Sequence, residues 1–185
     1  MKRIAFAAFF FVLVSLIFLQ TLSFSLHAAT PIRTLDAVVT RVIDGDTVVT
    51  ETSNGTRLKV RLYGIDAPEL ARAGKPGQPF APESTSYLSS LVLGKTVRLD
   101  IWAIDRYRRM VAMIWLDGRN VNKAMISAGM AEAYVEYLKH EPNRSQFLKA
   151  ERKAKEKKVG IWSLGRKYER PTAYKNRLAK TDKKS

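Results

Sequence analysis

The sequence contains no cysteine and only two histidines, His27 and His140, among its 185 residues. Zinc ribbons, iron–sulfur clusters, disulfide frameworks and thiol nucleophiles all require cysteine, so the sequence excludes them. The scarcity of histidine also argues against metal sites built from several histidines and against most serine hydrolases. Any hydrolytic chemistry must therefore rely on carboxylates, arginines, tyrosines or a metal ion that prefers oxygen ligands.

Acidic residues are the minority among the charged residues. There are 17 Asp and Glu against 32 Lys and Arg, which gives a formal net charge of +15. An excess of this size predicts a polyanionic partner such as nucleic acid or anionic lipid. The length is sufficient for one domain with a hydrophobic core of its own.

Residues 1–29 have the pattern of a targeting segment. Lys2 and Arg3 precede a long apolar run, and no further charge occurs before Arg33. A cleaved secretory signal is one interpretation. An uncleaved membrane anchor is the other, because the uncharged stretch 4–26 is long enough to span a bilayer. The first predicts a secreted or periplasmic protein, and the second predicts a membrane-anchored protein whose domain faces outside.

After this segment we expect a linker at residues 30–36, one domain at residues 37–162 and a mobile basic tail at residues 163–185. Turn residues and hydrophobic alternation predict five strands and three helices. The expected strands cover residues 37–43, 47–52, 57–62, 96–103 and 110–116, and the expected helices cover residues 82–93, 121–128 and 144–158. This order predicts an α+β domain built on a small five-stranded barrel.

Four acidic residues stand at strand ends or in turns: Asp44, Asp46, Asp66 and Glu69. A hairpin with its turn at Asn54-Gly55 would bring Asp46 and Asp66 together at one end of the sheet. Two close carboxylates repel each other, and a divalent cation relieves that repulsion. Oxygen ligands without His or Cys select Ca²⁺ or Mg²⁺. Each motif alone is also typical of an ordinary turn, but their pairing across one hairpin favours a metal site.

Two arginines extend this arrangement. Arg61 lies on the charged face of the strand that leads to Asp66, and Arg109 ends the charged loop 105–109. Isolated arginines of this kind often only face solvent. Next to two carboxylates and Glu69, however, they could donate hydrogen bonds to phosphate oxygens. The set would then contain the parts of a phosphodiesterase that needs no histidine.

Three motifs occur in order along the chain: Val-Ile-Asp-Gly-Asp-Thr at 42–47, Val-Arg-Leu-Tyr-Gly-Ile-Asp-Ala-Pro-Glu at 60–69 and Asp-Arg-Tyr-Arg-Arg at 105–109. Together they resemble the staphylococcal (micrococcal) nuclease, or thermonuclease-like, family. Gly-Ile-Trp at 160–162 fits as well, so the resemblance extends from about residue 37 to residue 162. It implies an OB-type five-stranded β-barrel with three helices. It also implies a secreted, Ca²⁺-dependent nuclease that cleaves DNA and RNA at the 5′-oxygen and leaves 3′-phosphates.

The resemblance also implies roles for individual residues. The residues that match catalytic positions are Arg61, Glu69 and Arg109. The residues that match calcium ligands are Asp46, Asp66 and, through its backbone carbonyl, Ala67. The residues that match substrate contacts are Arg106, Tyr107 and Tyr137. Tyr134 is the alternative to Tyr137 as the aromatic residue that stacks on a base. Ala67 stands where the best-known member has Thr, a change that a backbone ligand survives. Arg108 stands where the family has Gly.

We keep three hypotheses in competition. The first is a monomeric nuclease acting on DNA and RNA, and the second is a non-catalytic nucleic-acid-binding module of the same fold. The acids favour the first, because a pure binder has no need of carboxylates facing a phosphate. The third is a protein held at an anionic membrane surface by its N-terminal segment and basic tail, which is compatible with nuclease activity.

Overall fold

The computed structural model describes residues 30–136, 138 and 144–182. The expected targeting segment 1–29 and Tyr137 lie outside the described residues. Within the described residues, no helix combines the length and the apolar character needed to cross a membrane.

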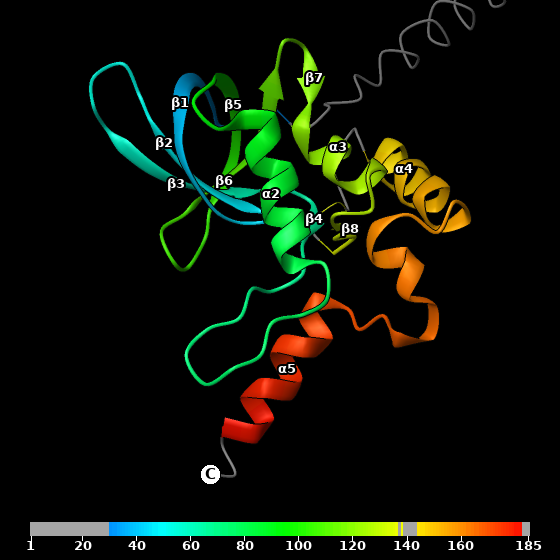
Figure 1. Cartoon of the computed structure of the whole chain (residues 1–185). Helices are drawn as coiled ribbons and strands as arrows, with labels where there is room; N and C mark the ends of the chain where they lie inside the picture. Colours follow the sequence, from blue (N-terminus) through cyan, green and yellow to red (C-terminus); the bar gives the residue numbers. More distant parts are fainter. Residues whose placement is uncertain (1–29, 137, 139–143, 183–185) are drawn as a thin grey trace, which may run out of the picture.

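Five strands form a closed barrel (Figure 1). They are β1 (Arg33–Asp44), β2 (Thr47–Glu51), β3 (Arg57–Leu62), β5 (Thr96–Ile104) and β6 (Met110–Leu116). Neighbours in the order β3-β2-β1-β5-β6 pair antiparallel, and a parallel pairing of β3 with β6 closes the ring. The predicted five-stranded barrel of the OB type is confirmed.

The first strand is longer than the sequence predicts. Residues 33–36, which were expected to belong to a linker, pair with β5 in the register Arg33↔Ile101 to Asp36↔Arg98. Residues 33–38 of β1 pair with β5, and residues 38–44 pair with β2. The second pairing contains two irregularities, which are typical of a strand that bends.

Three short strands complete the sheets. β7 (Arg119–Asn120) extends the main sheet beyond β6. β4 (Ile65–Asp66) pairs antiparallel with β8 (Glu132–Ala133), in a register that sets Asp66 opposite Glu132. This small sheet fixes the backbone of Asp66 beside the open end of the barrel.

The described residues contain five helices rather than the expected three. They are α2 (Ala81–Val92), α3 (Val121–Ser127), α4 (Arg144–Glu156), the 3₁₀ helix η1 (Gly160–Lys167) and α5 (Pro171–Asp182). The first three correspond to the expected helices. The other two lie almost entirely in the segment expected to be a mobile tail, and Figure 1 shows α5 beside the loop that joins β4 to α2.

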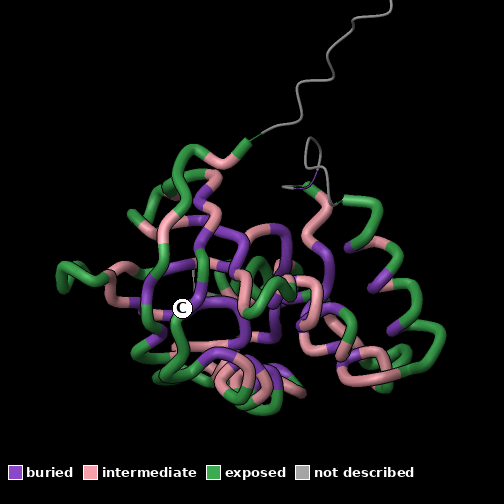
Figure 2. The backbone as a smooth tube through the Cα atoms, turned by 90° about the horizontal axis from the view of Figure 1, so that it is seen from above, coloured by how far each residue is buried: buried purple, intermediate pink, exposed green. Residues whose placement is uncertain are grey.

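The core fills the barrel and continues beneath the helices, as the buried stretches in Figure 2 show. Strand β3 alternates as its sequence predicts: Val60 and Leu62 are buried, whereas Arg57 and Lys59 are exposed. Asn122 is buried, and its side-chain amide donates to the backbone carbonyls of Tyr63 and Ala112. It therefore ties α3 to the end of β3, where the chain turns toward Asp66.

Candidate functional site

A cleft of about 590 Å³ lies at the open end of the barrel, between the loop 105–109 and α5. Charged and polar side chains from five parts of the chain line it: Asp44, Asp46, Arg61, Asp66, Glu69, Arg72, Asp105, Arg106, Tyr107, Arg109, Tyr134, Thr172 and Lys175. Charges of both signs converge here, which makes this cleft the candidate functional site.

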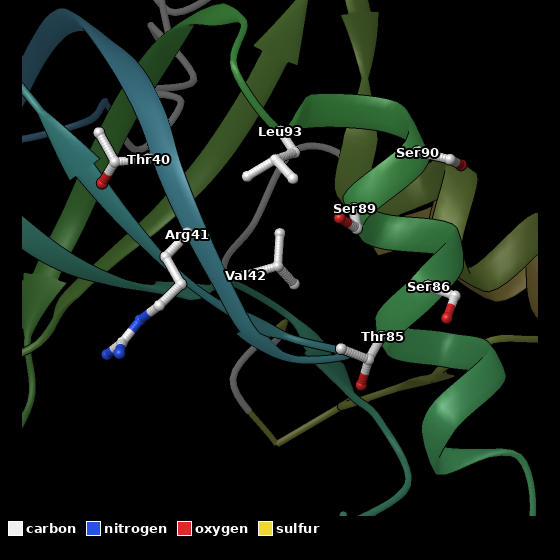
Figure 3. A pocket seen from close by; sticks show the side chains of 8 residues that line it. All are labelled: Thr40, Arg41, Val42, Thr85, Ser86, Ser89, Ser90 and Leu93. Atoms are coloured by element: carbon white, nitrogen blue, oxygen red, sulfur yellow. The ribbon is translucent and has the colours of Figure 1, made fainter.

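A second hollow, between β1 and α2, lacks this convergence. Figure 3 shows its lining, which consists of serine, threonine and aliphatic side chains with one arginine, Arg41. The guanidinium of Arg41 extends away from α2, and no acidic residue lines the hollow. This hollow offers hydroxyl groups but no acidic and basic side chains close together. We therefore take the first cleft as the candidate functional site.

At the centre of the cleft, Arg61 bridges Asp46 and Asp66. Its Nη1 lies 2.8 Å from Asp46 Oδ2, and its Nη2 lies 3.0 Å from Asp66 Oδ1. All three side chains are largely buried, with exposed fractions of 13%, 8% and 0%. The hairpin of β2 and β3 places Thr47 opposite Arg61, which sets Asp46 and Arg61 at the same end of the sheet. The expected meeting of the two carboxylates across this hairpin is therefore present.

The backbone around Asp46 is held by local contacts. Asp46 Oδ2 accepts a hydrogen bond from the backbone N–H of Ala67 (2.9 Å), and Oδ1 accepts one from the hydroxyl of Thr47 (3.0 Å). Gly45 allows α2 to approach, because a Cβ at this position would lie 2.0 Å from the hydroxyl oxygen of Ser84. The Asp-Gly-Asp sequence thus supplies both the carboxylate and the space that its neighbouring helix needs.

One buried oxygen of the site has no hydrogen-bond partner in the described structure: Oδ2 of Asp66. A buried carboxylate oxygen left in this way is costly unless a further cation or donor reaches it. Oxygen donors without His or Cys suit a divalent cation such as Ca²⁺ or Mg²⁺. The residues present therefore fit a divalent cation held by Asp46 and Asp66. Among the described residues, no group of three or more His, Cys, Asp or Glu side chains is placed to hold a metal.

Burial and mutual repulsion perturb the carboxyl groups. Burial, with repulsion from Asp46 as the next cause, raises the pKa of Asp44 from 3.8 to about 7. The same two causes raise the pKa of Asp66, although the positive charges of Lys175 and Arg61 oppose them. Burial lowers the pKa of Arg61, but attraction to Asp46 and Asp66 outweighs it, and the net shift is upward. The cleft is therefore a place where additional positive charge is favourable.

The raised pKa of Asp44 predicts a pH dependence of stability. Because this pKa is 3.8 in the unfolded chain and about 7 in the folded one, the folded protein binds more protons between these values. In the metal-free protein, Asp44 should therefore contribute a fall in the free energy of unfolding as the pH rises from about 4 to about 7. In Asp44→Asn this fall should be smaller by an amount on the order of 1 kcal/mol. Urea unfolding across this pH range measures the difference.

The control for this prediction is Asp36→Asn, which removes an exposed carboxylate of the same strand. It should leave the pH dependence as in the wild type. Parallel curves for Asp44→Asn and the wild type would show that Asp44 titrates normally.

The loop 105–109 presents cations to the cleft. Asp105 organises it by accepting hydrogen bonds from the backbone N–H groups of Tyr107 (2.9 Å) and Arg109 (3.0 Å). The guanidinium of Arg109 also pairs with Asp105, with Nε 2.7 Å from Oδ2. The guanidinium groups of Arg106 and Arg109 both lie over the ring of Tyr107, at 4.8 and 5.4 Å from its centroid. Arg108 adopts a left-handed conformation, with φ of 61°, which favours glycine.

Glu69 lies at the mouth of the cleft and meets two cations. Its Oε1 lies 2.9 Å from Nζ of Lys175, and its Oε2 lies 3.5 Å from Nη2 of Arg72. The backbone N–H of Glu69 donates to the side chain of Gln78 at 3.1 Å. Since Lys175 also contacts Asp66, the carboxylates of Glu69 and Asp66 are joined through one ammonium group.

Most of the residues singled out from the sequence lie in this cleft. Arg61, Glu69, Arg109, Asp46, Asp66, Arg106 and Tyr107 line it. Ala67 is buried beside Asp46, which its backbone N–H contacts. Tyr137 lies outside the described residues, and the alternative aromatic residue, Tyr134, lines the cleft.

Helix α5 contributes Thr172 and Lys175 to the cleft, a contribution that was not predicted from the sequence. Two signals could have revealed it. Pro171 stands at the first position of the helix, where proline is favoured. Tyr168 and Tyr174 are aromatic residues in a segment otherwise rich in charge, and solvated tails contain few aromatic residues.

The closed barrel and the charged cleft agree with a comparison against protein families. Residues 59–164 match the family model described as staphylococcal nuclease homologue. The chain belongs to this family.

Individual relatives agree with that assignment. The chain is 39% identical over 133 residues to the probable endonuclease LCL3 of Pyricularia oryzae, an alignment that covers 69% of this chain and 52% of the relative. It is 34% identical over 170 residues to the protein of the same name from Clavispora lusitaniae, covering 77% and 73%. It is also 38% identical over 125 residues to an uncharacterized endonuclease of Haemophilus influenzae, covering 68% and 65%. The chain spans about half the length of the first curated relatives it matches.

Proposed function

We propose that the protein is a Ca²⁺-dependent endonuclease that hydrolyses phosphodiester bonds of DNA and RNA. The observation that carries this proposal is the convergence of Asp46, Asp66, Arg61 and Glu69 in one cleft. The names of the relatives and the membership of the staphylococcal nuclease family support it. The net charge of +15 provides attraction for a polyanionic substrate.

Asp46, Asp66 and the backbone carbonyl of Ala67 would hold the calcium ion. The buried and unpartnered Oδ2 of Asp66 supports this assignment. When bound, Ca²⁺ would supply Lewis-acid stabilisation of the negative charge on a phosphate oxygen.

The side chains of the cleft have separate roles in the hydrolysis. Glu69 orients a water molecule and accepts its proton while the water oxygen forms a bond to phosphorus. The bond between phosphorus and the 5′-oxygen breaks, and that oxygen takes up a proton from water, so the products carry a 3′-phosphate and a 5′-hydroxyl. Arg61 and Arg109 donate hydrogen bonds to the non-bridging oxygens, where negative charge accumulates.

The loop 105–109 would hold the neighbouring part of the nucleic acid. Tyr107 is 64% exposed, and Arg106 lies against its ring, so the pair offers both a cation and an aromatic surface. Arg106 would contact the adjacent phosphate. A base would stack on Tyr137 or on Tyr134, since every base offers a face to an aromatic ring whatever the sequence.

Cleavage in the presence and absence of calcium tests the proposal. The full-length chain is incubated with end-labelled single-stranded DNA or RNA, with Ca²⁺ or with a chelator. We expect cleavage only with Ca²⁺, and fragments that end in 3′-phosphates. Binding of DNA without cleavage under any of these conditions would favour the non-catalytic binding module instead.

We further propose that residues 1–29 direct export, so that the domain acts outside the cytoplasm. The basic start followed by an apolar run supports this proposal. N-terminal sequencing of the exported protein should find a start near Thr30 if the segment is cleaved. A start at Met1 in the membrane fraction would indicate an anchor, and a protein retained in the cytoplasm would contradict export altogether.

A further inference from the structure

Lys175 places a positive charge among the acids of the candidate site. Its Nζ lies 3.0 Å from Oδ1 of Asp66 and 2.9 Å from Oε1 of Glu69. Lys175 and Asp66 are 109 positions apart in the sequence. The residue belongs to α5, beyond the region that matches the family model. The contact is thus made by a helix that lies C-terminal to the matched region.

Helix α5 is attached to the loop that carries Glu69. The hydroxyl of Tyr174, the residue before Lys175, donates to the backbone carbonyl of Pro76, and Tyr174 is only 4% exposed. The side chain of Gln78 donates to the backbone carbonyl of Glu169 at 2.8 Å, just before the helix begins. These contacts hold the helix against the mouth of the cleft.

A second attachment lies next to Asp66. The buried Glu132, which stands opposite Asp66 in the small sheet, accepts a hydrogen bond from the hydroxyl of Tyr168 (2.8 Å). It also pairs with Arg170, whose Nε lies 2.9 Å from its Oε1. The segment that leads into α5 is therefore held beside Asp66. From there, Lys175 of α5 extends to Asp66 and Glu69.

The ammonium of Lys175 and a divalent cation require the same oxygens. A calcium ion bound by Asp66 would place two positive charges beside an ammonium group 3.0 Å from the same carboxylate. Like charges at such close range repel strongly in a partly buried cleft. The side chain of Lys175 is 43% exposed, so it has room to leave toward solvent.

We propose that α5 is an intramolecular lid, and that Lys175 occupies the carboxylate site in the resting protein and is displaced when a divalent cation binds. The inference rests on the proposed function in one respect, that the cation binds at Asp66. Lys175 and Arg61 together neutralise part of the acidic charge while no metal is bound. Binding of the cation and opening of the lid are then coupled, each favouring the other.

The first test is the affinity of the full-length protein for Ca²⁺, measured by titration calorimetry. Lys175→Met removes the competing ammonium group and should tighten Ca²⁺ binding about tenfold. Lys180→Met removes the same charge from an exposed position of α5 and should change the affinity by less than about twofold.

A further variant separates competition by the lid from a simple loss of charge. Tyr174→Phe keeps every charge but removes the hydroxyl that attaches α5 to Pro76. It should tighten Ca²⁺ binding in the same direction as Lys175→Met, though by less. An unchanged affinity in both variants, with normal binding by the wild type, would overturn the lid and leave the proposed function standing.

Hydrogen exchange provides an independent readout. If Ca²⁺ displaces Lys175, amide exchange within residues 171–182 should become faster when Ca²⁺ is added to the wild type. Greater protection of this helix, or a lower rate of cleavage by Lys175→Met at saturating Ca²⁺, would place Lys175 in the active state and overturn the proposal. Absence of Ca²⁺ binding by the wild type would instead contradict the calcium dependence itself.

Discussion

Glu69→Gln should lower the rate of DNA cleavage at saturating Ca²⁺ by about 10²- to 10⁴-fold. An amide cannot accept the proton of the attacking water, but it has nearly the same size as the carboxylate, and the backbone N–H of residue 69 can still donate to the side chain of Gln78 at 3.1 Å. The shape of the cleft is therefore retained. Affinity for single-stranded DNA should stay close to that of the wild type, because the change does not remove a positive charge. Single-turnover kinetics and a binding titration measure the two quantities.

Glu83→Gln is the matched control for this variant. Glu83 is an exposed acid in the first turn of α2, outside the cleft. The variant Glu83→Gln should cleave DNA at the wild-type rate. If Glu69→Gln also cleaved at that rate, the role of Glu69 as proton acceptor would be wrong. If it lost DNA binding together with cleavage, Glu69 would instead act by holding the loop in place.

Arg61→Met should destabilise the metal-free protein by about 3 kcal/mol. The guanidinium bridges Asp46 and Asp66 at 2.8 and 3.0 Å, and its removal leaves two buried carboxylates without this partner. Added Ca²⁺ should recover part of the lost stability, because the ion compensates the same carboxylates. Cleavage should remain impaired at saturating Ca²⁺, because a donor to the phosphate has been lost. Urea unfolding with and without Ca²⁺ measures the first two effects.

The same strand provides a control. Arg57 pairs with Glu51 at 3.0 Å, but its side chain is 78% exposed. Arg57→Met should therefore cost less than about 1 kcal/mol and leave cleavage nearly unchanged. Equal losses of stability in the two variants would show that burial of the Arg61 bridge is not what makes it important.

The core of the site could be predicted because it is built from contacts that short-range patterns specify. The turn at Asn54-Gly55 and the alternation along residues 57–62 set the register of β2 and β3. That register brings Asp46 and Arg61 to the same end of the sheet, and Asp66 follows four residues after β3. The structure confirms this meeting and adds that Arg61 bridges the two acids.

The start of the barrel and the end of the chain were predicted less well. Residues 33–36 were predicted to be part of a linker, yet they pair with β5, a strand more than 60 positions away in the sequence. The segment after Ser163 read as a mobile tail because basic residues dominate it. Partners distant in the sequence, such as Glu132 and Pro76, hold it in place instead. Such pairings cannot be predicted from local sequence patterns, because each partner residue is also compatible with an exposed position.

The sequence by itself therefore determined the barrel, its carboxylate pair and the kind of chemistry that a protein without cysteine and with two histidines can carry out. These depend on turns, alternation and residue types, which act within a few positions along the chain. Only the tertiary structure decided that α5 returns to the cleft and that Lys175 meets Asp66 and Glu69 there. The physical reason is that a buried acid takes its cationic partner from whichever basic residue packing brings close, and this sequence contains 32 Lys and Arg residues.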